Sequence, residues 1–228
     1  MREIVFDTET TGLDPNAGHR VVEIGCVELI NHMPTGETRQ WYINPQRDMP
    51  EEAYNVHGLS EAFLSDKPLF SAIAQEFVDF VDGATLIAHN ANFDMKFMNA
   101  ELAALDRPNL PKDKVIDTIP MARKKIPGAQ YSLDALCRRF QIDLSVREKH
   151  GALLDAELLA EVYLELIGGR QPGLVLASDN SAAMDDGTAT QGLEAKTARS
   201  PRAHAPTADE DAAHQAFVDK ISDPIWKK

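Results

Sequence analysis

The stretch Ile4-Val5-Phe6-Asp7-Thr8-Glu9-Thr10-Thr11-Gly12 decides the fold, because an apolar, β-branched run leads straight into two acids. The apolar run is typical of a buried strand. On an extended backbone Asp7 and Glu9 point to the same side, since successive side chains alternate. Two carboxylates gathered there repel each other, and a divalent cation such as Mg²⁺ or Mn²⁺ offsets that repulsion. A lone pair of this kind more often marks two solvated acids at a strand end, so the rest of the chain has to decide.

The net charge limits the kinds of function that the chain can have. Its 228 residues fit one good-sized domain plus extra segments, and the formal net charge is −13. Proteins that hold nucleic acid by their own electrostatics usually carry a basic surface. A nucleic-acid substrate of this chain must therefore be held locally, through metals, or be delivered by a partner.

Cysteine usage and hydropathy predict a cytoplasmic protein. Cys26 lies in an apolar, strand-like run and Cys137 in a helical pattern, so both are expected to be buried apolar residues rather than a disulfide or metal site. No run approaches the length of a membrane span, and the first residues lack the long apolar segment of a signal peptide.

Hydrophobic patterning predicts an α/β fold with a mixed sheet and helices on its faces. The strand patterns are residues 4–6, 21–29, 39–44, 85–88 and 115–118, and the helical patterns are residues 68–83, 93–105, 132–136 and 151–167. Short connections between the first three strands favour an antiparallel meander. The later alternation of helices and strands is typical of parallel pairing.

The composition changes at Gln171. Residues 178–207 contain almost no large apolar side chain, which predicts a flexible linker. In residues 208–228, Phe217, Val218 and Ile221 share one helical face, and Ile225-Trp226 follow. This segment is too short to fold alone, which favours a docking peptide, although a frayed tail with incidental apolar residues remains the alternative.

Three further residues near element ends can join the first two acids. Asp94 closes His89-Asn90-Ala91-Asn92-Phe93-Asp94 at a strand–helix junction, where it alone fits a helix N-cap. Asp155 lies one turn into the helix at residues 151–167, either at the surface or aimed at the sheet. His150 precedes that helix, a position where a lone histidine is usually structural or solvent-facing. Together the four acids and the histidine form a coherent site for two metals.

In this order the motifs D-x-E-T-T-G, H-N-A-x-F-D and H-G-A-L-L-D resemble those of the DEDDh branch of 3′→5′ exonucleases. The resemblance covers about residues 1–170, and the stretches Val56-His57-Gly58 and Ser132-Leu133-Asp134-Ala135-Leu136-Cys137 support it. Within that branch the chain resembles the epsilon proofreading subunits of bacterial DNA polymerase III. A related branch has Tyr four residues before the last Asp; Gly151 stands there in this chain, and His150 takes the role. The resemblance implies a ribonuclease-H-like exonuclease fold with a five-stranded mixed sheet.

The resemblance also implies the roles of the site residues. Two divalent cations, Mg²⁺ or Mn²⁺, are held by four metal ligands, namely Asp7, Glu9, Asp94 and Asp155. Asp7 bridges the cations, and His150 is the general base that accepts a proton from the attacking water. The product is a nucleoside 5′-monophosphate.

Substrate contacts follow from the same resemblance. Thr8 and Glu9 come near the 3′-terminal nucleotide, and His57 and Glu52 match positions that touch the substrate. Three apolar residues are expected either to contact the terminal base or its pocket or, alternatively, to be buried in the core: Leu13, Val56 and Phe93.

The segments beyond residue 170 resemble partner-binding peptides. Gln171-Pro172-Gly173-Leu174-Val175-Leu176 resembles a degenerate sliding-clamp-binding peptide, within residues 171–177; it also reads simply as the last apolar residues before the linker. The terminal Asp223-Pro224-Ile225-Trp226-Lys227-Lys228 resembles the tail that binds the polymerase catalytic (alpha) subunit. A small theta-like subunit is a third candidate partner. Such tethering supplies the DNA 3′ end at high effective concentration, which accounts for the acidic balance.

Two other functions compete with proofreading. A stand-alone RNA-trimming exonuclease or oligoribonuclease has the same active site but no need of the tail. A scaffold between polymerase and clamp needs the tail but not the intact constellation of acids.

Overall fold

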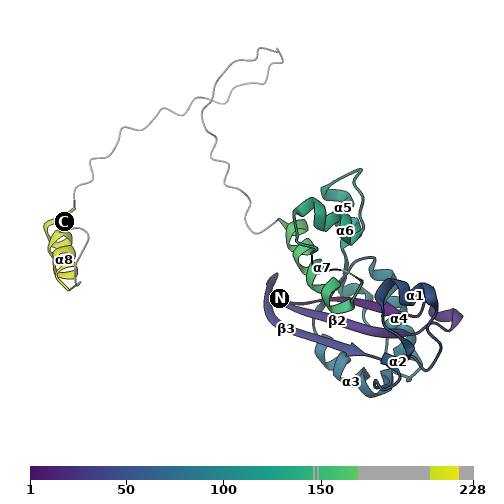
Figure 1. Cartoon of the computed structure of the whole chain (residues 1–228). Helices are drawn as coiled ribbons and strands as arrows, with labels where there is room; N and C mark the ends of the chain where they lie inside the picture. Colours follow the sequence, from purple (N-terminus) through teal and green to yellow (C-terminus); the bar gives the residue numbers. More distant parts are fainter. Residues whose placement is uncertain (146, 148, 169–205, 221–228) are drawn as a thin grey trace, which may run out of the picture. The chain divides into compact units, whose positions relative to one another are not determined.

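A computed structural model describes residues 1–145, 147, 149–168 and 206–220 (Figure 1). The chain divides into two units, Met1–Leu176 and Ala177–Lys228. The predicted clamp-binding peptide, the linker up to residue 205 and residues 221–228 lie outside the described residues.

The first unit is built on one five-stranded sheet with the order β3-β2-β1-β4-β5. Its strands are β1 (Arg2–Thr10), β2 (Val21–Ile30), β3 (Met33–Tyr42), β4 (Thr85–Ala88) and β5 (Val115–Asp117). β1 pairs antiparallel with β2, as does β2 with β3, whereas β1–β4 and β4–β5 are parallel. This confirms the predicted mixed sheet and its opening meander.

The sequence patterns found four helices of the first unit and missed three short ones. The helices of the first unit are α1 (Glu51–His57), α2 (Glu61–Leu64), α3 (Phe70–Val81), α4 (Ala91–Ala103), α5 (Thr118–Lys125), α6 (Leu133–Phe140) and α7 (Ala152–Ile167). α1, α2 and α5 span at most eight residues each. Such short segments carry too few turns for an apolar stripe to stand out.

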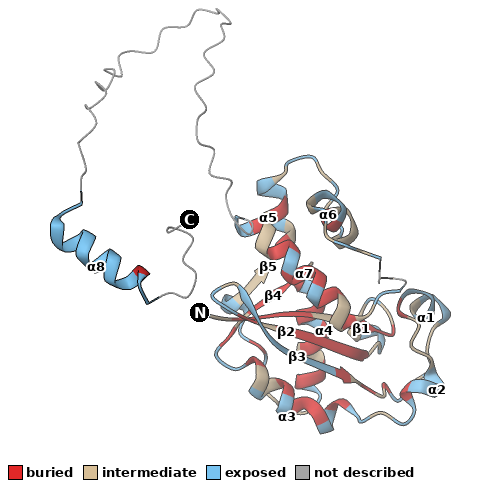
Figure 2. Ribbon diagram, turned by 60° about the vertical axis from the view of Figure 1, so that its left-hand side comes forward, coloured by how far each residue is buried: buried red, intermediate tan, exposed pale blue. Residues whose placement is uncertain are grey.

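Alternation along β1 sends its side chains to two different layers. Ile4 and Phe6 are fully buried in the cluster that contains the apolar side chains of α3 and α4. Val5 packs instead with the apolar side chains of α7. Figure 2 shows buried residues along both the strands and the helices that cover them. Because side chains two apart share a face, Asp7 and Glu9 lie on the side of α7, and Thr8 on the side of α4.

A glycine lets α7 lie close to β2. A Cβ built at Gly25 would come 2.2 Å from the carbonyl carbon of Ala152, the first residue of α7. Only glycine allows that approach, so this one residue of β2 fixes where the helix begins over the sheet. In the register of the sheet Gly25 lies opposite Asp7.

The second unit contains α8 (Ala208–Val218), within the segment predicted to dock. Thr207 and Glu210 form a capping box at its start. Phe217 is exposed.

Both cysteines are buried free thiols, as predicted. In the part of the chain that the structure describes, no helix is long and apolar enough to cross a membrane.

Candidate active site

Asp7 and Glu9 stand at the end of β1, on the face that α7 covers. Burial raises the pKa of Asp7 well above its usual range, and the nearby carboxylates of Asp94 and Glu9 raise it further. Burial, followed by the charge of Asp155, raises the pKa of Glu9 to about 8. Glu9 is 8% exposed and Asp7 is half-buried, so the pair differs from the two solvated acids that the motif alone also allowed.

Asp94 belongs to the first turn of α4 and is only 2% exposed. The N-cap of α4 is Asn90, in the left-handed region at φ 66°, so the alternative role of Asp94 as N-cap is wrong. The hydroxyl of Thr8 donates a 2.7 Å hydrogen bond to Oδ1 of Asp94. Burial raises the pKa of Asp94 to about 7, although the Thr8 hydrogen bond acts to lower it.

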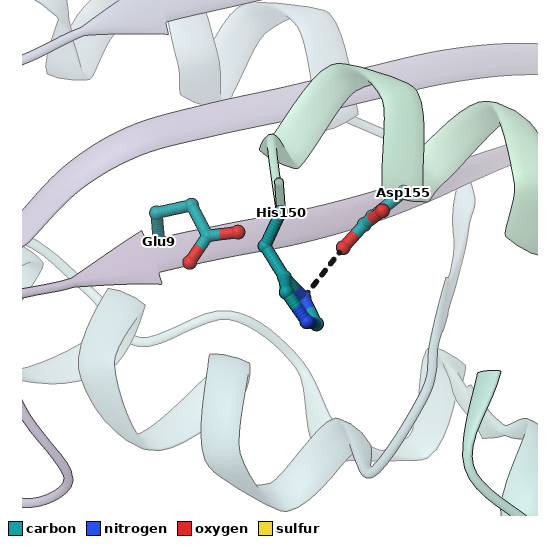
Figure 3. Close-up of side chains that lie close together, drawn as sticks. All are labelled: Glu9, His150 and Asp155. Carbon is teal, nitrogen blue, oxygen red and sulfur yellow. Dashed lines mark hydrogen bonds and ion pairs between the residues drawn. The ribbon is translucent and has the colours of Figure 1, made fainter. Parts of the chain in front are cut away.

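Asp155 lies in the first turn of α7 and is aimed at the sheet, with 3% exposure. Nδ1 of His150 lies 3.1 Å from Oδ2 of Asp155. Glu9, His150 and Asp155 each offer a ligand atom, and these atoms lie within 4.8 Å of one another (Figure 3). Side chains from β1 and from the start of α7 therefore lie close together in the folded protein.

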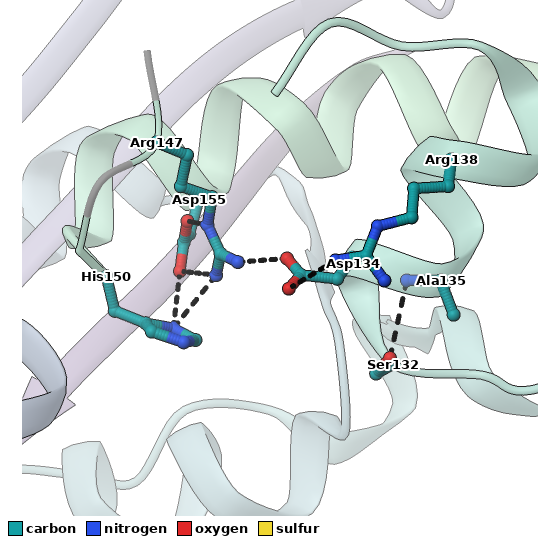
Figure 4. Close-up of polar contacts among 7 residues, drawn as sticks. All are labelled: Ser132, Asp134, Ala135, Arg138, Arg147, His150 and Asp155. Atoms are coloured by element: carbon teal, nitrogen blue, oxygen red, sulfur yellow. Dashed lines mark hydrogen bonds and ion pairs between the residues drawn. The ribbon is translucent and has the colours of Figure 1, made fainter. Parts of the chain in front are cut away.

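Arg147, which no sequence motif singled out, also reaches this point. Its Nε donates a 2.6 Å hydrogen bond to Oδ1 of Asp155, and one terminal nitrogen donates a second 2.6 Å hydrogen bond to Oδ2 (Figure 4). The same terminal nitrogen lies 2.8 Å from Nδ1 of His150, and the other terminal nitrogen pairs with Asp134. Burial acts to raise the pKa of Asp155, but the hydrogen bonds from His150 and Arg147 outweigh it and hold this pKa below its usual value.

A second residue missed in the sequence is Glu23 of β2, which is 2% exposed. Its carboxylate accepts a 2.7 Å hydrogen bond from the side chain of Gln40. Burial raises the pKa of Glu23, while Gln40 and the backbone N–H groups of Ala152 and Leu153 act to lower it. Gly151, the N-cap of α7, has no side chain to pair with these N–H groups. A carboxylate from the sheet thus caps the helix that carries Asp155. The available signal was an acid inside an otherwise apolar strand run.

The predicted substrate residues line one pocket of about 520 Å³ beside the acids. They are Thr8, Glu9, Leu13, Glu52, Val56, His57 and Phe93. Leu13 is 83% and Val56 47% exposed, so neither belongs to the core, whereas Phe93 is partly buried against it. An adjoining pocket of about 240 Å³ is lined by the four predicted metal ligands, His150 and Arg147.

His57 is a neutral imidazole in the wall of the larger pocket. Burial lowers its pKa to about 4, and its Nδ1 accepts a 3.0 Å hydrogen bond from the backbone of Leu59. A buried neutral ring with Nδ1 as acceptor carries its proton on Nε2.

Comparison with known proteins decides the family. A family model described as Exonuclease matches residues 4–163. The epsilon subunit of DNA polymerase III from Rickettsia conorii is 50% identical, over 97% of this chain and 96% of the relative. That of Escherichia coli K12 is 44% identical, over 96% and 93%. The chain belongs to the exonuclease family of DNA polymerase III epsilon subunits.

Solved structures agree with this epsilon-family assignment at the level of fold. The nuclease domain of 3′hExo, a DEDDh family member bound to rAMP, superposes with a TM-score of 0.64 at 19% identity, over 73% of this chain and 91% of that one. Exonuclease X in complex with 5′ overhanging duplex DNA gives 0.57 at 26% identity, over 72% and 90%. The predicted ribonuclease-H-like exonuclease fold is thereby confirmed. The epsilon-family chain is accordingly a metal-dependent 3′→5′ exonuclease.

Proposed function

We propose that this epsilon-family exonuclease is the proofreading subunit of a replicative DNA polymerase and removes mispaired 3′-terminal nucleotides as 5′-monophosphates. One observation carries the proposal: Glu9, His150 and Asp155 converge within 4.8 Å beside an open pocket, with Asp7 and Asp94 in the same wall. The similarity to the R. conorii subunit extends over nearly the whole chain, so it includes the tail that a stand-alone RNA trimmer does not need.

The chemistry of the four acids suits hard divalent cations, and Glu9 and Asp155 bring carboxylate oxygens within 4.8 Å of each other. Carboxylates from β1, α4 and α7 line one small pocket, and the raised pKa values of Asp7 and Glu9, caused by burial and by neighbouring acids, reflect the cost of placing these acids together. Cations of the size and hardness of Mg²⁺ or Mn²⁺ relieve it. The four acids, Asp7, Glu9, Asp94 and Asp155, would hold these cations. When bound, two such cations neutralise the charge of the scissile phosphodiester and stabilise its in-line displacement.

His150 is placed to act as the general base. Its side chain is about half exposed, so water reaches it, and its Nδ1 faces Oδ2 of Asp155. With a proton on Nδ1, donated to Asp155, the ring keeps a lone pair on Nε2 that can accept the proton of the attacking water. In the other tautomer Nδ1 accepts from Arg147 instead, and Nε2 has no lone pair to offer.

The larger pocket is proposed to hold the 3′-terminal nucleotide. Leu13 and Val56 present exposed apolar side chains there and are placed to pack against the terminal base. Glu52 and the neutral His57 offer polar groups on the same wall. The hydroxyl of Thr8 is engaged by Asp94, so Thr8 would contact substrate through its backbone.

The domain boundaries and partners remain proposals. Residues 1–170 form the exonuclease domain, residues 171–177 a clamp-binding peptide and residues 178–207 a linker. Residues 208–228, which begin with α8, dock on the polymerase alpha subunit. We also propose a theta-like third subunit and a cytoplasmic location.

Digestion of a 5′-labelled DNA primer with a 3′ mismatch tests the function. In Mg²⁺ or Mn²⁺ we expect a ladder that shortens from the 3′ end, absent in EDTA and in Asp7→Ala. A clear preference for a short RNA oligomer would replace proofreading by RNA trimming. No cleavage of either substrate by the folded protein would leave the scaffold role as the better account.

A further inference from the structure

Arg147 holds the carboxylate of Asp155 with two parallel hydrogen bonds. Both distances are 2.6 Å, one to each carboxylate oxygen. The Arg147 side chain is 7% exposed, although most of its described neighbours in residues 141–150 are exposed or half-buried. A bidentate guanidinium–carboxylate pair is the strongest geometry that two such side chains can form. Arg147 is therefore a built part of the site rather than a surface residue nearby.

The same guanidinium lies among the other acids of the site. Its positive charge acts electrostatically on Asp7 and on Glu9. It thus neutralises part of the charge that divalent cations are proposed to neutralise. One carboxylate oxygen has two acceptor positions, and Arg147 takes one on each oxygen of Asp155 while His150 faces Oδ2 as well. A cation bound to Asp155 would lie within a few ångströms of the guanidinium, where like charges repel strongly.

We propose that Arg147 and a divalent cation compete for the carboxylate of Asp155, so that Arg147 sets how tightly the site holds metal. Such competition rests on the proposed function, in which Asp155 is a metal ligand. In this proposal Arg147 controls the affinity of the site for metal. This differs from a role in which Arg147 only holds the Asp155 side chain in position. A support would strengthen metal binding, whereas a competitor weakens it.

Asp134 gives the guanidinium a second partner on the outer side. This residue lies in the first turn of α6, is 39% exposed, and accepts from the terminal nitrogen of Arg147 that does not contact Asp155. Arg138 also approaches Asp134, at 3.7 Å. Asp134 can remain paired with Arg147 after the ion pair between Arg147 and Asp155 has broken. It therefore favours the arrangement in which Asp155 is free to bind metal. Removal of Asp134 should therefore change metal affinity in the direction opposite to removal of Arg147.

Calorimetric titration of the full chain with Mn²⁺ at one pH tests these signs. We expect Arg147→Ala to bind Mn²⁺ on the order of tenfold more tightly. Arg147→Lys should lie between, since an ammonium cannot hold both oxygens in a fixed fork. Asp134→Asn should bind several-fold more weakly, and that loss should vanish in the Arg147→Ala background. Arg138→Ala is the matched control, because its side chain is 72% exposed and contacts Asp134 rather than Asp155.

Thermal unfolding in EDTA supplies a readout independent of metal and activity. Arg147→Ala should unfold at a lower temperature than wild type, because the acids lose their protein cation. Added Mn²⁺ should raise its unfolding temperature by more than that of wild type.

The outcomes separate this proposal from the proposed function. If folded Arg147→Ala binds Mn²⁺ no more tightly than wild type, while Asp155→Asn loses binding, competition is wrong and the metal site stands. If Asp155→Asn binds Mn²⁺ as wild type does, the metal assignment itself fails. Should Arg147→Ala not fold, unchanged affinity in both Arg147→Lys and Asp134→Asn overturns the competition.

Discussion

The hydroxyl of Thr8 donates a 2.7 Å hydrogen bond to Oδ1 of Asp94, joining the first strand to the helix that follows the fourth strand. Both side chains are almost fully buried. The resemblance places Thr8 near the 3′-terminal nucleotide, and its side chain also supports a metal-ligand candidate. Buried hydrogen bonds to charged groups contribute about 1.5–3 kcal/mol each.

Thr8→Val tests this support. It removes the donor at nearly constant volume, so we expect weaker Mn²⁺ binding and a fall in kcat of about tenfold or more. Thr8→Ser keeps the hydroxyl and should stay near wild type. An increase in KM for DNA with unchanged Mn²⁺ affinity would instead return the Thr8 side chain to the substrate.

Gly25→Ala should displace α7. The added methyl would lie 2.2 Å from the carbonyl carbon of Ala152, so the backbone of the helix has to move. We expect a loss of about 1–3 kcal/mol or more in the free energy of unfolding and a large loss of nuclease activity. Gly151→Ala is the matched control, because no heavy atom lies within 4 Å of its Cβ position and its φ of −153° suits any residue. Equal effects of both variants would contradict the packing account.

The stability of the metal-free protein should depend on pH. The folded-state pKa of Glu9 is raised to about 8 and that of Asp94 to about 7, mainly by burial. A carboxyl group whose pKa is raised on folding stabilises the fold below its unfolded pKa, near 4, and this contribution is lost as pH rises through the folded value. In EDTA, Tm should therefore fall between about pH 5 and pH 9.

Saturating Mn²⁺ should flatten that dependence, because cations stabilise the ionised carboxylates. Differential scanning fluorimetry across this range, with and without metal, measures both slopes. Asp155 does not add to this fall, since its pKa is lowered and its contribution is lost only at acidic pH. Equal slopes with and without Mn²⁺ would contradict the placement of the metal at these acids.

Cleavage and polymerase binding should separate in Asp7→Ala. Asp7 belongs to the sheet unit, and the proposed docking segment belongs to the other unit. We expect this variant to lose cleavage and to retain binding of a purified polymerase alpha subunit by gel filtration. Truncation after residue 207 should show the reverse. Loss of binding in folded Asp7→Ala would show that the two functions share a surface.

The motif residues were predictable because each stands where a regular element begins or ends. Strand alternation alone places Asp7 and Glu9 on one face, and the strand–helix junction places Asp94 beside them. The long apolar pattern of α7 placed Asp155 one turn into the helix but left open whether its side chain faces solvent or the sheet. Element order and the mixed sheet followed from the same periodicities.

The supporting residues could not be predicted, since their roles depend on contacts between distant segments. Arg147 lies in a charged stretch without periodicity, and nothing local distinguishes it from Arg138 or Arg139. Glu23 caps a helix that begins more than a hundred residues later. Thr8 alternates away from the acids on either side of it, and only the packing of α4 supplies its partner.

Anomalous diffraction from crystals grown with Mn²⁺ and a nucleoside 5′-monophosphate tests the central claim most directly. The claim is that Asp7, Glu9, Asp94 and Asp155 hold two divalent cations beside the pocket for the 3′-terminal nucleotide. We predict two manganese peaks about 4 Å apart, with Asp7 between them. Absence of any peak near these carboxylates, in protein that still degrades DNA from the 3′ end, would contradict the account.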